Sequence, residues 1–113
     1  MTNLEAIAAE IEPYSLSDES IEKSFVDAAS HFDNAASSED TYDGTMKQVC
    51  AYAAMLALNR VRVLANENIG GISQSYDVGK LEKRIRALAQ SAGLSPDLVL
   101  ADTDNDSISF IQM

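Results

Sequence analysis

The 113-residue chain has one cysteine, one histidine and no tryptophan. The lone cysteine, Cys50, cannot form a disulfide within the chain, and a zinc site would need several more His or Cys ligands. His31 has no nucleophile motif around it that would indicate a Ser–His–acid triad. The chain also lacks the glycine-rich loops that bind nucleotide phosphates. These absences predict a protein that is not an enzyme and has no metal or cofactor site.

Positive charge and long apolar stretches are also scarce. The net charge is −10, which argues against direct or sequence-specific nucleic-acid binding by the monomer, since such binding needs clustered positive charge. The longest apolar run, Val49–Leu58, is too short to cross a bilayer. The first residues are acidic and lack the basic and apolar regions of a signal peptide. We therefore expect a soluble protein with no membrane contact.

The charges that are present are distributed unevenly. Residues 1–44 hold eleven acidic residues and one lysine, whereas residues 45–96 hold seven basic and three acidic residues. Residues 97–113 contain four further acidic residues. This pattern has two interpretations: a solvated acidic surface that keeps the protein soluble, or contacts between unlike surfaces within or between subunits.

Four apolar patterns with helical period predict four helices, with Leu4, Phe25 and Ile85 on the apolar stripes of the first, second and last helix. Thr2 and Glu5 have capping-box spacing, Ser17 and Asp77 are candidate N-caps, and Gly93 suits a helix C-terminus. Pro13 ends the first helix because the residue before a proline resists the α conformation. The predicted helices span residues 2–12, 18–32, 45–67 and 78–92, followed by a short turn at 95–100.

Polar or glycine-containing segments separate and follow these helices. We interpret residues 34–44 as an acidic linker, 69–76 as a loop and 101–113 as an acidic tail, with partial strand-like alternation at 107–112. The sequence therefore predicts one all-α domain over residues 1–113. It is a small bundle of about four main helices, including the N-terminal helix within 1–13, with a short extended C-terminal tail.

The acidic tail also carries a partial resemblance to a calcium loop. Asp102, Asp104 and Asp106 have the spacing of the first EF-hand ligands, but Ser107 replaces the glycine and Met113 the final glutamate of that loop. Two interpretations stay open: a solvated acidic loop, or weak or shared calcium binding.

The two central features of the chain are its longest apolar run and a basic helix surface. A helix that is apolar on every side must be buried on every side, so the long helix should supply the core, with Leu56 among the core candidates, and any part left uncovered would face another subunit. On the last helix, Lys80, Lys83, Arg84 and Arg86 lie off the apolar stripe. They form either a solvated face, with a Glu82–Arg86 pair, or a docking surface for an acidic neighbour such as residues 1–44 of another copy.

Four segments between residues 18 and 94 carry a family resemblance: FVDAAS, VCAYAAMLALNRV, IGGISQSYD and LEKRIRALAQSAG. In their order along the chain and in their residue pattern they resemble the small head–tail connector (adaptor) proteins of tailed bacteriophages. The resemblance implies a helical subunit that forms a ring between portal and tail, through which DNA passes. It also implies a place in the virion, and in the bacterial cytoplasm during assembly. The helix before Pro13 and the acidic tail depart from the family pattern.

Under this hypothesis the partners are further copies of the chain and portal or tail proteins. The expected interface residues are Ile69, Ile72 and Tyr76 in the glycine loop, with Lys83 and Arg86 on the basic helix. The alternative is a non-enzymatic interaction or regulatory module of a bacterium or prophage, acting as a monomer or dimer.

Overall fold

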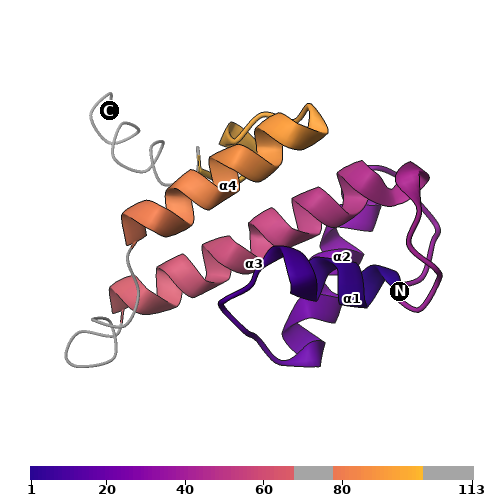
Figure 1. Ribbon diagram of the computed structural model, residues 1–113, viewed down its shortest axis with the longest axis horizontal. Coiled ribbons are helices and arrows are strands. Elements are labelled where there is room, and N and C mark those ends of the chain that lie inside the picture. Colours follow the sequence, from indigo (N-terminus) through magenta and orange to yellow (C-terminus); the bar gives the residue numbers. More distant parts are fainter. Residues whose placement is uncertain (68–77, 101–113) are drawn as a thin grey trace, which may run out of the picture.

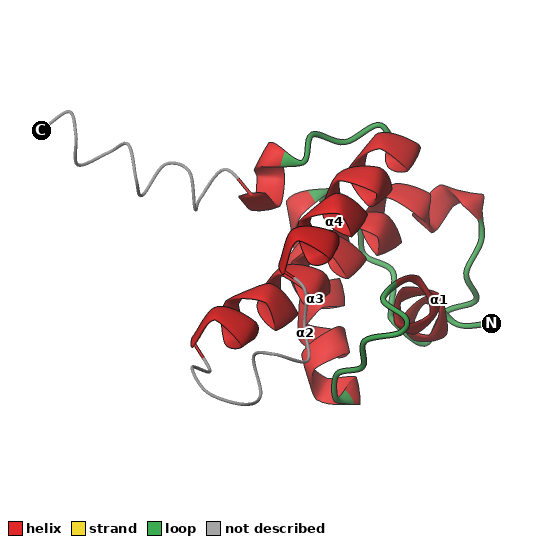
Figure 2. Cartoon of the chain, turned by 60° about the vertical axis from the view of Figure 1, so that its left-hand side comes forward, coloured by secondary structure: helices red, strands yellow, loops and turns green. Residues whose placement is uncertain are grey.

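One long helix, α3 (Lys47–Glu67), forms the axis of the fold. The computed structural model describes residues 1–67 and 78–100. In it α4 (Val78–Ala92) and α2 (Asp18–His31) pack on opposite sides of α3, and α1 (Asn3–Glu10) packs against α3 and α2 at one edge (Figure 1). Figure 2 shows the same order, with α3 between α4 and α2. The all-α prediction is confirmed: within the described ranges there is no named strand, only an isolated bridge between Thr2 and Thr41.

The first two helices begin where their capping residues predict. Thr2 and Glu5 form a complete capping box at the start of α1, and the Ser17 hydroxyl accepts a hydrogen bond from the Ser20 backbone N–H at the start of α2. These contacts satisfy backbone donors that have no partner within the helix. The α1 helix ends at Glu10, two residues earlier than predicted.

The end of α4 also follows its sequence signal. Gly93 has a φ of +72°, and the Leu94 backbone N–H donates to the Ala89 carbonyl at 2.8 Å. This left-handed residue reverses the chain after the helix. A short helical turn follows, in which the Leu100 N–H donates to the Pro96 carbonyl at 2.9 Å.

Gly93→Ala should lower the free energy of unfolding by about 1–2 kcal/mol, because a Cβ makes the left-handed conformation unfavourable. The nearest atom to that Cβ would be Gln48 Nε2 at 4.0 Å, so the cost would come from the backbone and not from a clash. The matched control is Gly44→Ala, where a Cβ would meet nothing within 4 Å. Urea denaturation should show a lower midpoint for Gly93→Ala only; equal midpoints for both variants would contradict the assignment.

The core forms where α1, α2 and α4 meet α3. Three alanines of α3, Ala53, Ala54 and Ala57, are completely buried and allow close helix approach. The largest fully buried side chains come from all four helices and the end of α1: Phe25, Ile7, Ile11, Met55, Leu58, Leu81, Ile85 and Asn3. Within the run Val49–Leu58 only Tyr52 and Leu56 are not fully buried, so the three shorter helices cover it almost completely. Leu56 is only partly buried, because it lies beside a groove between α2 and α3.

The segment predicted as an acidic linker is tied to the N-terminal residues. The backbone N–H groups of Asn3 and Leu4 donate to the carbonyls of Asp40 and Ser38, at 2.9 and 3.0 Å. The Tyr42 N–H donates to the Met1 carbonyl at 2.9 Å. This segment therefore supplies acceptors for the first donors of α1, a role that its composition does not reveal.

One polar contact between α3 and α4 differs from the predicted pair on α4 alone. Glu82 accepts a hydrogen bond from Arg62 Nη1 at 3.3 Å, so the predicted pairing of Glu82 with Arg86 is wrong. Arg62 is almost completely buried, and its Nε and Nη2 also donate to Asn59 Oδ1 at 2.9 and 2.7 Å. A buried guanidinium needs such partners, which explains why Glu82 turns toward α3.

Candidate functional site

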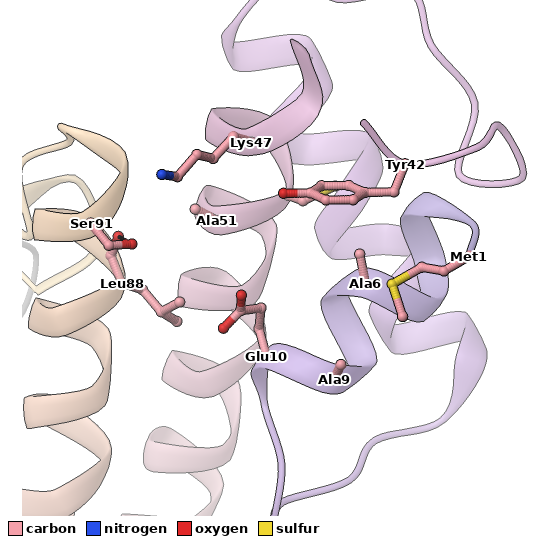
Figure 3. Close-up of a pocket in the computed structure, with 10 residues that line it drawn as sticks. Met1, Ala6, Ala9, Glu10, Tyr42, Lys47, Ala51, Leu88 and Ser91 are labelled. Carbon is pink, nitrogen blue, oxygen red and sulfur yellow. Dashed lines mark hydrogen bonds between the residues drawn. The ribbon is translucent and has the colours of Figure 1, made fainter. Parts of the chain in front are cut away.

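A small pocket lies at the junction of α1, α3 and α4. Its volume is about 160 Å³. Figure 3 shows the side chains of Glu10 and Lys47 extending toward α4, from which Leu88 and Ser91 extend back. The lining residues are Met1, Ala6, Ala9, Glu10, Tyr42, Lys47, Cys50, Ala51, Leu88 and Ser91.

The pocket holds two groups whose pKa values are raised. Burial raises the pKa of the Cys50 thiol to about 11. Burial, followed by electrostatic interactions with Cys50, Glu10 and Asp43, raises the pKa of the Tyr42 phenol. Both groups are therefore protonated at neutral pH. The thiol lies 3.7 Å from Asn3 Oδ1 and 4.0 Å from the Asn3 carbonyl oxygen. The lining thus offers hydrogen-bond partners to water or a small molecule, and no activated nucleophile.

Cys50 should react slowly with thiol reagents in the folded protein. A rise in pKa from 9.0 to about 11 lowers the thiolate fraction about 100-fold at neutral pH, and the thiolate is the reactive form. Labelling with an aromatic disulfide at neutral pH should therefore be at least about 100-fold slower in buffer than in urea. Comparable rates in the two conditions would show that the thiol is exposed and easily ionised.

A second hollow, an open groove of about 380 Å³, lies between α2 and α3. Its α3 wall includes Leu56 and two exposed apolar residues, Val63 and Leu64, which are 39% and 46% exposed. Polar and charged residues form the remaining lining: Lys23, Ser24, Asp27, Asn59 and Arg60. The groove therefore combines exposed apolar surface with a charged rim.

The predicted basic surface lies on the side of α4 away from its apolar stripe. Lys83 and Arg86 are exposed. Arg84 is used within the chain: its Nη2 donates to the Glu10 carbonyl at 2.6 Å and lies 3.9 Å from the Glu10 carboxylate. The other predicted interface residues, Ile69, Ile72 and Tyr76, lie outside the described residues, as does the Asp102–Asp104–Asp106 group.

A third, wider hollow lies between α1 and α2 and was not predicted from the sequence. It is an open depression of about 590 Å³, lined by Leu4, Asp18, Glu19, Glu22 and Lys23. Leu4 is only partly buried although it belongs to the apolar stripe of α1. Glu22 also accepts a hydrogen bond from the Ser38 hydroxyl. We call this depression the acidic hollow.

Residues 1–67 and 78–100 contain neither a cluster of metal ligands nor a helix that could cross a membrane. No group of three or more His, Cys, Asp or Glu side chains in these ranges is arranged to hold a metal ion. None of the helices there has the length and hydropathy to span a bilayer.

Comparison with protein families gives one match, the DUF6706 family, which is described as a family of unknown function. The match covers residues 1–112. The chain belongs to this family. No curated protein and no solved structure matches the chain. The DUF6706 match therefore assigns a family without an activity.

Proposed function

We propose that this DUF6706 chain is a non-enzymatic structural subunit of a phage head–tail connector. In this role it would bind further copies of itself and the portal or tail proteins, in the virion and in the host cytoplasm during assembly. The observation that carries the proposal is the exposed apolar surface of the α2–α3 groove, on a helix that is otherwise well covered. Apolar residues surrounded by a polar rim are the arrangement found in protein–protein contacts.

Two further observations support this function over catalysis and over an unspecified module. The pocket between α1, α3 and α4 contains a protonated thiol and phenol and offers no activated nucleophile. Three of the four connector-like segments also form helices, as expected of a helical subunit: FVDAAS lies in α2, VCAYAAMLALNRV in α3 and nearly all of LEKRIRALAQSAG in α4. The partner is inferred from that resemblance and from the groove together.

The test is binding to the portal protein encoded in the same phage genome. We expect the two proteins to co-purify after co-expression, and Val63→Glu to weaken binding at least tenfold, because a carboxylate would lose its hydration in an apolar contact. The matched control is Val26→Glu. Val26 is also an exposed valine, at 52% exposure, but it lines a different hollow. The control should bind as the wild type does.

Failure of the wild-type chain to bind portal or tail proteins would contradict the connector function. If it then bound a different protein as a monomer or dimer, the alternative of a regulatory or interaction module would replace it. Equal weakening by Val63→Glu and Val26→Glu would show that the groove is not the contact surface.

A further inference from the structure

The two sides of the molecule carry opposite charge. The helices α4 and α2 lie on opposite sides of α3, and α1 lies beside α3, where it also contacts α4 through Arg84 and Glu10 (Figures 1 and 2). The α4 side contributes basic residues, and the α1–α2 side contributes most of the eleven acidic residues of the first 44. Among the described residues, only Arg84 and Glu10 form an ion pair that joins α4 to α1 or α2.

The outward face of α4 is a continuous exposed stripe. Lys83, Arg86, Ala87 and Gln90 are all exposed and follow the i, i+3, i+4, i+7 spacing of one helix face. Ala87 is small and leaves room for a close approach at the centre of the stripe. Neither Lys83 nor Arg86 forms an ion pair with another described residue. We call this stripe the basic face.

The acidic hollow has the shape and chemistry to receive such a helix face. Its wall includes Leu4, and its rim includes the exposed carboxylates of Asp18 and Glu19. The cation in its lining, Lys23, is paired with Asp27 at 2.9 Å. Long Lys and Arg side chains cover apolar surface with their aliphatic stems while the charged ends reach polar groups. A broad, open depression with an apolar wall and acidic rim therefore suits a basic helix face better than it suits a small ligand.

We propose that copies of this chain associate head to tail, with the basic face of α4 in one copy docked on the acidic hollow of the next. The occupant is a second copy because the chain itself carries both complementary surfaces, on opposite sides. The contact between Arg84 and Glu10 shows that cations of α4 already pair with acidic residues of α1 inside one copy. The inference deepens the proposed function in that it names the self-contact, but it does not depend on portal binding.

Head-to-tail contact has a structural consequence. The two surfaces differ, so each copy retains one free basic face and one free acidic hollow after pairing. Such heterologous contacts produce closed rings when the rotation between copies closes, and open filaments when it does not. The charges steer and orient the copies, so the association should weaken as salt increases.

Charge reversal tests this inference with two complementary variants. The first carries Lys83→Glu and Arg86→Glu, and the second carries Asp18→Lys and Glu19→Lys. In sedimentation velocity at low salt, each alone should self-associate at least about tenfold more weakly than the wild type, because like charges would face each other. An equimolar mixture should recover association, since every contact between the two different variants pairs an acidic surface with a basic one. Recovery also shows that both variants are folded.

Lys47→Glu serves as the control, because Lys47 is an exposed cation that belongs to neither surface; it should associate as the wild type does. The inference is overturned if the wild type stays monomeric, if the two variants associate like the wild type, or if their mixture stays monomeric. These outcomes are distinct from loss of the connector function. Charge-dependent self-association without portal binding would support the head-to-tail contact and contradict the connector function. Portal binding by a monomer would support the connector function and contradict the head-to-tail contact.

Discussion

Phe25→Ala should lower the free energy of unfolding by about 3–5 kcal/mol, because it removes a large buried ring and leaves a cavity. Phe25 lies on the inner face of α2 and is 2% exposed, within the cluster that joins α2 to α3. Urea denaturation should show a lower midpoint with an unchanged dependence on urea concentration.

The neighbouring Val26 provides the control, since it lies on the outer face of the same helix. Val26→Ala should change the free energy of unfolding by less than about 0.5 kcal/mol, as exposed positions usually do. Similar losses for both variants would mean that α2 packs on α3 through a different face.

Asn3→Asp should be comparably destabilising, by about 3–5 kcal/mol at neutral pH, because it places an unpaired charge in the interior. Asn3 is 0% exposed, and its Nδ2 donates to the Ser37 carbonyl at 2.9 Å. In the variant a carboxylate oxygen would face that carbonyl instead, and the hydrogen bond would become a repulsion. The same urea titration measures the loss.

Asn34→Asp makes the same substitution where the carboxylate keeps its partner. Asn34 Oδ1 accepts a hydrogen bond from the Ala36 N–H at 2.8 Å, and an aspartate can accept the same bond. This variant should stay within about 1 kcal/mol of the wild type. If Asn3→Asp were equally mild, the hydrogen bonds between the start of α1 and residues 37–42 would not form as described.

The helices were predictable because their signals are local. Capping residues such as Thr2 and Ser17, and the left-handed Gly93, act within a few residues of the helix ends they define. Apolar periodicity likewise predicted the buried faces of α2 and α4, including Phe25 and Ile85.

The contacts between distant segments were not predictable, because spacing along a helix does not identify a tertiary partner. Glu82 has the spacing to pair with Arg86, but it binds Arg62, which is buried and needs an acceptor. Similarly, the polar composition of residues 37–42 suggested a linker, whereas their carbonyls bind the start of α1.

The candidate surfaces were predicted in part. The basic face follows from the 3.6-residue period of α4, so Lys83 and Arg86 could be assigned to it from the sequence. The acidic hollow and the α2–α3 groove depend on how α1, α2 and α3 pack together, which the sequence pattern does not specify. The sequence pattern therefore predicts Leu4 and Leu56 as ordinary core residues, whereas in the structure each lines a depression at the surface.

The mass of the wild-type particle in solution shows whether this chain is a self-associating subunit. Light scattering over a concentration series, at low and high salt, should give a mass above the 12.2 kDa of one chain. That mass should rise with protein concentration and fall as salt screens the opposed charges. A mass of 12.2 kDa at every concentration and salt level would show that copies of the chain do not associate, and would rule out the head-to-tail contact.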